Sequence, residues 1–184
     1  MIKKTVYILL FVIFLIAMVI QFFSPTSINS QGEFQVYKTI NINKPITTVY
    51  EYMGNSENAK IWSVYVDHID LLSGEDGKVG CKRRCFKDSS EKGIQWDEEI
   101  LEIIPNKKRV LSIYNGKHFP VYSEHLITEQ LYTGDDNNCE LSLILTLKGN
   151  QSFWENFKFK FASFVVKNVF KNNLNNIKKD LEKK

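Results

Sequence analysis

The residues that could carry acid–base chemistry gather in two places. Four carboxylates lie between residues 97 and 102, and His125 lies in a later segment of strand character. A carboxylate or imidazole held in an apolar cavity can act as a general acid or base, because burial shifts its pKa. Strand alternation places Glu98 and Glu102 on the same face as Trp96. A solvated outer face is the simpler interpretation of the carboxylates, and a surface or core position that of the histidine.

Signatures of other chemistries are absent from the sequence, which has no H-E-x-x-H, C-x-x-C, G-x-S-x-G, P-loop or G-x-G-x-x-G motif. Cys81 and Cys85 would stand roughly 13 Å apart on one strand, which is too far for a disulfide. Three free, partly buried thiols are therefore expected, although Cys139 could pair with one of them in an exported domain. We expect no metal and no cofactor.

The composition is that of a globular domain with a basic end. The chain has 184 residues, of which 43% are hydrophobic and 24% charged, and its net charge is +3. Residues 150–184 alone hold eight lysines and three acidic groups. These lysines are spread around a predicted helix, which argues against nucleic-acid binding. A solvated helix face is the simplest interpretation, with contact to anionic lipid as the alternative.

The first 23 residues are typical of a transmembrane anchor. Residues 5–23 carry no charge and would span roughly 28 Å as a helix, close to the ~30 Å of a bilayer core. Lys3 and Lys4 precede this run and no basic residue follows before Lys38, so we expect a cytoplasmic N-terminus and an exported domain. The length of the run favours a single-pass anchor in the cell membrane over a cleaved signal peptide.

A polar linker at 24–33 is predicted to lead into a domain at 34–184. Residues 34–42 alternate between apolar and polar side chains, as in a half-buried strand. Asn43 is a candidate N-cap for a helix that Gly54 can end. One further helical turn is expected before Trp62.

The rest of the domain is predicted as six strands and a long helix. Their short links imply an antiparallel meander, with the sharpest turn at Asn115-Gly116. Ser152 and Glu155 form a capping box that begins the final helix. The predicted strands are 63–72, 80–87, 94–104, 109–115, 121–132 and 139–148. The helix carries one apolar stripe at Phe153, Phe157, Phe161 and Phe164, and an offset one at Phe170, Leu174, Ile177 and Leu181.

This order of elements resembles the START-like superfamily, in particular its polyketide cyclase/dehydrase-like (SRPBCC) branch. The cues are the strand that runs into Ile42-Asn43-Lys44-Pro45, the Trp62-Ser63 pair, the Val79-Gly80 strand start, Ile100-Leu101-Glu102 with Pro105, and the apolar strand 141–147. The resemblance implies an α+β helix-grip fold, in which an antiparallel sheet wraps a long C-terminal helix. It carries over no catalytic residue.

The resemblance also implies a cavity that binds a hydrophobic small molecule or lipid. A non-catalytic, membrane-anchored bacterial carrier is our first hypothesis. A cyclase- or dehydratase-like enzyme using Glu98 or His125 is the alternative, and a cavity-less protein-interaction domain is the second. The oligomeric state stays open. Aromatic and histidine side chains that could line the cavity, or simply pack in the core, are Trp62, Trp96, Tyr114, Tyr122, His125, Phe157, Phe161 and Phe164.

Overall fold

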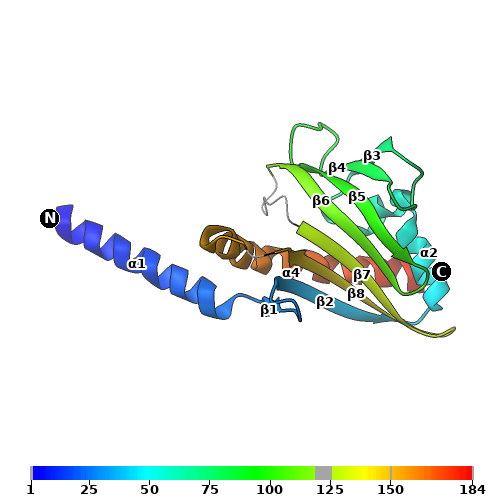
Figure 1. Ribbon diagram of the computed structural model, residues 1–184, viewed down its shortest axis with the longest axis horizontal. Coiled ribbons are helices and arrows are strands. Elements are labelled where there is room, and N and C mark those ends of the chain that lie inside the picture. The colour runs from blue at the N-terminus through cyan, green and yellow to red at the C-terminus, as the bar shows by residue number, and fades with distance from the viewer. Residues whose placement is uncertain (1, 119–125, 150, 184) are drawn as a thin grey trace.

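A single antiparallel sheet curves around the C-terminal helix in the computed structural model, which describes residues 2–118, 126–149 and 151–183 (Figure 1). Its eight strands follow the order β1-β2-β8-β7-β6-β5-β4-β3, so the chain crosses from one edge to the other after β2 and then returns as a meander. The N-terminal helix α1 projects from one end of this body, beside the start of the C-terminal helix (Figure 1). The expected sheet-around-helix architecture is confirmed.

The element bounds agree with most of the sequence predictions, and β2 matches its predicted bounds. The helices are α1 (Ile2–Phe23), α2 (Ile46–Gly54), the 3₁₀ turn η1 (Ser56–Asn58), α3 (Ala59–Trp62) and α4 (Phe153–Glu182). The strands are β1 (Ser27–Ile28), β2 (Phe34–Ile42), β3 (His68–Ser73), β4 (Lys82–Phe86), β5 (Gln95–Ile104), β6 (Lys108–Lys117), β7 (Leu126–Gly134) and β8 (Cys139–Leu147).

The turn predicted at Asn115-Gly116 is wrong. Both residues lie inside β6, where the register against β5 shifts between Gln95 and Asp97. Asn115 takes a left-handed backbone with φ of 52°, a conformation that asparagine tolerates better than most residues. Its side chain donates to Asp97 Oδ2 at 2.9 Å. The turn-forming residues therefore build a β-bulge that lets β6 continue.

The predicted N-cap is also wrong. Helix α2 begins at Ile46 after Pro45, and no side chain caps it. The Asn43 backbone N–H instead donates to Glu182 Oε1 at 2.8 Å, which ties this corner to the end of α4. The end of α2 at Gly54 and the capping box of Ser152 with Glu155 are as predicted.

Helix α4 is rotated relative to the sequence prediction. Its later stripe, which includes Leu174, Ile177 and Leu181, is buried against the sheet as expected. Continued backward at helical spacing, that stripe leads to Phe159 and Ala162, which are buried in the second core cluster. The first stripe consequently faces away from the sheet, and Phe153, Phe161 and Phe164 are 68%, 60% and 44% exposed.

The predicted linker is a structured hairpin. Strand β1 pairs with β2, with Ser27 opposite Gln35. Glu33, at the end of the turn, accepts hydrogen bonds from the Gly149 backbone N–H and from Lys148 Nζ, both at 2.9 Å. Residues 24–33 therefore hold the end of α1 close to the start of α4.

Helix α1 is the one helix within the described residues that is long and apolar enough to cross a membrane. That stretch is Lys4–Phe23, with a mean hydropathy of 2.9. Its side chains are exposed almost throughout, and Ile20 alone among its described apolar residues is buried. Core packing therefore does not account for its composition.

Candidate functional site

A cavity of about 150 Å³ lies between α4 and the concave face of the sheet. Strands β4 to β8, helix α3 and helix α4 all contribute to its wall. The wall is mainly aliphatic and aromatic, with Trp62, Trp96, Leu143 and Val166 among its members. Such a lining favours an apolar occupant, because apolar surface leaves water on binding.

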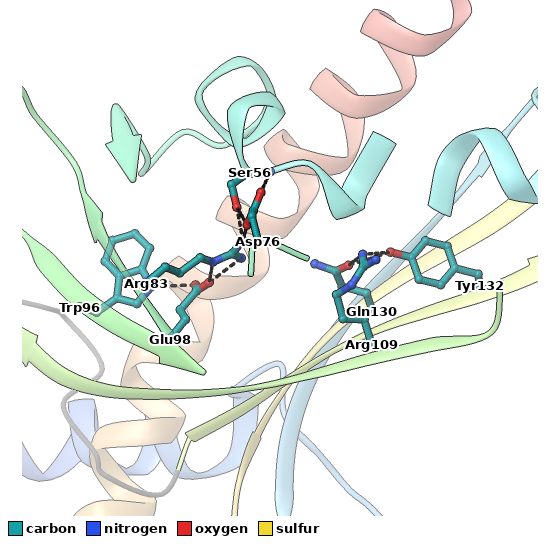
Figure 2. A network of polar contacts seen from close by, with 8 residues as sticks. All are labelled: Ser56, Asp76, Arg83, Trp96, Glu98, Arg109, Gln130 and Tyr132. Carbon is teal, nitrogen blue, oxygen red and sulfur yellow. Dashed lines mark hydrogen bonds and ion pairs between the residues drawn. The ribbon is translucent and has the colours of Figure 1, made fainter. Parts of the chain in front are cut away.

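One polar group of the wall is a buried ion pair between neighbouring strands. Arg83 on β4 donates from Nε and Nη2 to Glu98 Oε2 on β5, at 2.9 and 2.7 Å. Trp96 Nε1 donates to the other carboxylate oxygen at 2.8 Å. Figure 2 shows the three side chains converging from adjacent strands. The pairing register places Arg83 opposite Glu98, so the sheet itself brings the charges together.

The far side of Arg83 reaches the loops beyond α2. Its Nη1 donates to Ser56 Oγ at 2.6 Å, and Ser56 in turn donates to Asp76 (Figure 2). Burial alone would lower the pKa of Arg83, but the adjacent Glu98 carboxylate raises it well above its ordinary value. The guanidinium is therefore a permanent charge that links the cavity wall to the 3₁₀ turn.

A second polar cluster borders the cavity at Gln130. Its Oε1 accepts from Tyr132 Oη at 2.7 Å and from Arg109 Nη1 at 3.2 Å (Figure 2). Burial raises the pKa of Tyr132, so its hydroxyl stays protonated. Arg109 is 4% exposed, and a Cβ added at Gly54 would lie 2.9 Å from its Nη2. The glycine at the end of α2 thus makes room for the guanidinium, which also suits the partial negative charge of a helix C-terminus.

The wall also holds a donor without a partner. Trp62 lines the cavity, and its indole Nε1 is buried with no hydrogen-bond partner among the described residues. The Trp62 carbonyl accepts from Asn176 Nδ2 on α4 at 3.1 Å, which fixes α3 against the helix. Trp62 therefore contributes its ring to the wall, and its indole N–H is a buried donor left unpaired, which is costly.

The predicted cavity residues fall into three groups. Trp62 and Trp96 line the cavity. Tyr114, on the opposite strand face from the lining residue Ile113, does not, and neither do the α4 residues Phe157, Phe161 and Phe164, which belong to its outer stripe. Tyr122 and His125 lie outside the described residues.

Some lining residues escaped the sequence prediction. Arg83, Gln130 and Asn173 line the wall, and only the strand register and the rotation of α4 reveal them. Glu98 also lines it, so the solvated outer face expected for this carboxylate is wrong. Glu102, which strand alternation placed on the same face as Glu98, does not line the cavity, because a register shift between Ile100 and Glu102 breaks the alternation.

The polar groups of the wall are arranged for structure rather than for proton transfer. Glu98 accepts three hydrogen bonds, which occupy most of its roughly four lone-pair sites.

The three cysteines are free and buried as expected. Burial raises the pKa of Cys81 and of Cys85, and it raises the pKa of Cys139 to about 11. Across the described ranges no cluster of His, Cys, Asp and Glu could hold a metal ion.

No protein-family model and no curated protein sequence matches the chain. Solved structures do. The chain is similar to protein MLL2253 from Mesorhizobium loti, with a TM-score of 0.62 and 13% identity over 81% of this chain and 97% of that one.

Two further structures are similar. The Zhui aromatase/cyclase from Streptomyces sp. R1128 matches with a TM-score of 0.62 and 15% identity, over 80% of this chain and 93% of that one. Ara h 8.0201 matches with a TM-score of 0.59 and 13% identity, over 79% and 98%. At these identities the likeness concerns the fold alone, which is the helix-grip fold that the sequence resemblance implied.

Proposed function

We propose that this protein binds a small apolar molecule between α4 and the sheet, without chemical turnover, while α1 holds the domain at a membrane. The observation that carries the proposal is the mainly apolar cavity of about 150 Å³ between α4 and the sheet. A small apolar molecule matches this lining, because its apolar surface leaves water on binding. The similarity to an aromatase/cyclase supports ligand binding by this fold.

The cavity volume sets the size of the ligand. A dry cavity of this volume accommodates a single aromatic ring, whereas sites for larger ligands measure roughly 300–1,000 Å³. The cavity is open on one side, so the remainder of a longer ligand would lie outside it. We therefore narrow the ligand class to a one-ring molecule or the end of a longer apolar chain.

The membrane part of the proposal is supported by α1. A signal sequence has a similar length and composition, but here Ile20 packs and Glu33 ties the following hairpin to Lys148 and Gly149, just beyond the end of β8. A helix integrated with the domain in this way is better suited to anchoring than to removal. The lysines that precede it favour a cytoplasmic N-terminus and a domain on the other side.

The enzyme alternative is not favoured by the cavity wall. Its candidate carboxylate, Glu98, is fixed by Arg83 and Trp96. His125 lies outside the described residues. A cavity-less interaction domain is not favoured either, because the space between α4 and the sheet is open.

Ligand-induced thermal stabilisation of the full-length protein in detergent tests the proposal. Toluene, indole and p-cresol are suitable probes. Saturation at 100 times Kd contributes about 2.7 kcal/mol, which corresponds to a Tm rise of about 5–10 °C for a domain of this size. Native mass spectrometry would identify any co-purified molecule.

Val169→Phe places a ring in the cavity wall and should abolish the Tm rise. Val79→Phe is the matched control, because Val79 is exposed and distant from the cavity wall. No stabilisation by any one-ring probe, or equal stabilisation of both variants, would contradict the proposal.

A further inference from the structure

The outer face of α4 is unusually apolar for a helix on a protein surface. Phe153 and Trp154 are each 68% exposed, and Phe161 is 60% exposed. The rings of Phe153 and Phe157 stack at 6.4 Å, with Trp154 edge-on to both. Contiguous exposed apolar patches of this kind mark interaction surfaces.

This aromatic face lies against α1. One hollow is lined by Val12, Leu15, Ile16, Val19 and Ile20 of α1 together with α4 residues Phe161, Phe164 and Val165. A second hollow joins the same stretch of α1 to Phe157 and Phe161. All these α1 residues lie within about three turns of its C-terminal end. If that helix spans a bilayer, the start of α4 lies at the depth of its last turns.

A basic hollow follows at the point where α1 ends. Pro25, two residues beyond α1, lines it together with Lys38 of β2 and with Phe164, Lys167 and Lys171 of α4. Asn168 completes the lining, and no acidic residue takes part. Lipid headgroups lie at the end of a transmembrane helix, and basic residues there attract the anionic ones. Along α4, the exposed aromatic residues come first and these lysines follow. This is the order expected for a helix that passes from the hydrocarbon layer to the headgroups.

We propose that the N-terminal half of α4 lies in the interfacial layer of the membrane that α1 spans, with its aromatic face among acyl chains and with Lys38, Lys167 and Lys171 on anionic phospholipid headgroups. The occupant of this surface is thus the bilayer. The inference rests on the proposed anchoring by α1, but it adds a second membrane contact that anchoring alone does not require.

The same placement gives the cavity a route from the bilayer. Val165 lines both the hollow shared with α1 and the cavity between α4 and the sheet. Its side chain is 42% exposed and forms part of the wall of each space. The two spaces thus adjoin at Val165, which is where the proposed placement would let an apolar ligand dissolved in the membrane enter the cavity.

A fluorescent label on the outer face of α4 tests the inference. The three native cysteines are buried, so Phe161→Cys can be labelled selectively with NBD, a polarity-sensitive dye. Leu72→Cys is the matched control on exposed β3. The full-length protein is reconstituted into vesicles of phosphatidylcholine with phosphatidylglycerol. We expect the label at 161 to be quenched by brominated acyl chains and several-fold slower to react with dithionite than the label at 72.

The lysine contribution is tested by replacing Lys38, Lys167 and Lys171 with Gln. Each replacement should shift the equilibrium between docked and undocked α4 by about fivefold, read as dithionite accessibility at 161. A matched triple variant replaces Lys78, Lys92 and Lys107, which are exposed and outside this hollow, and should change nothing. Equal effects of the two triple variants would overturn the headgroup contact.

The outcomes separate this inference from the anchoring on which it rests. Loss of the protein from the vesicles on carbonate extraction would overturn the anchoring by α1. A carbonate-resistant protein whose label at 161 is as accessible as that at 72 would overturn the inference alone. Protection from dithionite without quenching by brominated chains would also overturn it, because α1 or a second copy would then cover the face.

Discussion

The Arg83–Glu98 pair shows how residue-level electrostatics organises the cavity wall. Both side chains are nearly buried, with 13% and 12% of their surface exposed. Buried pairs gain little over an apolar replacement, but leaving one member unpaired is costly. The pair also fixes Trp96 on one side and Ser56 on the other. Its role is therefore to hold the wall in one arrangement.

We expect Arg83→Met to lower the free energy of unfolding by about 3 kcal/mol, because it leaves the Glu98 carboxylate buried without its partner. Arg83→Met with Glu98→Gln should recover most of that loss. Urea unfolding in one detergent gives the comparison. Lys60→Gln removes an exposed pair with Glu57 and should cost less than about 0.5 kcal/mol. A double variant no more stable than Arg83→Met would contradict this account.

The three thiols should be chemically silent in the folded protein. Only the thiolate reacts. Burial raises the pKa of Cys81 and of Cys85, and it raises the pKa of Cys139 to about 11. We expect no reaction with Ellman's reagent at pH 8 in the native state and three thiols per chain after unfolding in urea. A thiol that reacts rapidly before unfolding would show that one of these sites is accessible.

At the scale of elements, the features predicted correctly are those that a local sequence pattern determines. The alternation of β2, the stop at Gly54 and the capping box at Ser152 are local signals, and all three are present in the structure. The rotation of α4 was not predictable in the same way. Two aromatic or aliphatic stripes competed for the core, and only the sheet decided between them. Phe159 and the small Ala162 fit against it, whereas Phe161 does not.

The existence of a cavity was predictable from the sequence, but the full set of residues that line it was not. The fold implied a space between sheet and helix, and Trp62 and Trp96 were named for its wall. Arg83 and Gln130 come from register across strands that are distant in sequence. The bulge beyond Ile100 then changes which side chains of β5 face inward. Long-range pairing, rather than composition, therefore decides the wall.

Glu33 gives the contact between the β1–β2 hairpin and the end of β8 a dependence on pH. The Gly149 backbone N–H, the Asn29 amide and Lys148 lower the pKa of Glu33 from 4.5 to about 2. A carboxylate with a lowered folded pKa stabilises the fold above its unfolded pKa, and this contribution is lost as pH falls from 4.5 toward 2.

We therefore expect Glu33→Gln to cost about 1 kcal/mol at pH 7, a value reduced for solvent screening. The difference from the wild type should shrink toward zero near pH 2. Urea unfolding at pH 7, 4 and 2.5 checks it. Glu140→Gln, at an exposed position of β8, should show no such trend. A Glu33→Gln penalty that persists unchanged at pH 2.5 would contradict the assignment.

At the scale of the whole molecule, three features meet at one end. The hairpin of β1 with β2, the start of α4 and the end of α1 are joined through Glu33 and through packing at Ile20. The cavity reaches this end at Val165. A domain tethered by a flexible linker would sample many orientations to its membrane, whereas this junction holds α4 beside α1. Under the proposed function, this orientation would decide whether the ligand arrives from lipid or from water.

Val165→Trp distinguishes these two routes. A large ring at the shared wall should slow loading of a membrane-dissolved probe by at least about tenfold, which equals ~1.4 kcal/mol in the barrier. Val165 also lines the cavity, so the equilibrium affinity is measured in parallel, and a loading rate that falls further than the affinity is the sign of a blocked route. Loading is followed in vesicles by stopped-flow quenching of the native tryptophans, with Val79→Trp as the control for an added indole. Unchanged loading in Val165→Trp would mean that ligand enters elsewhere, since a route past this side chain cannot stay open when the ring fills it.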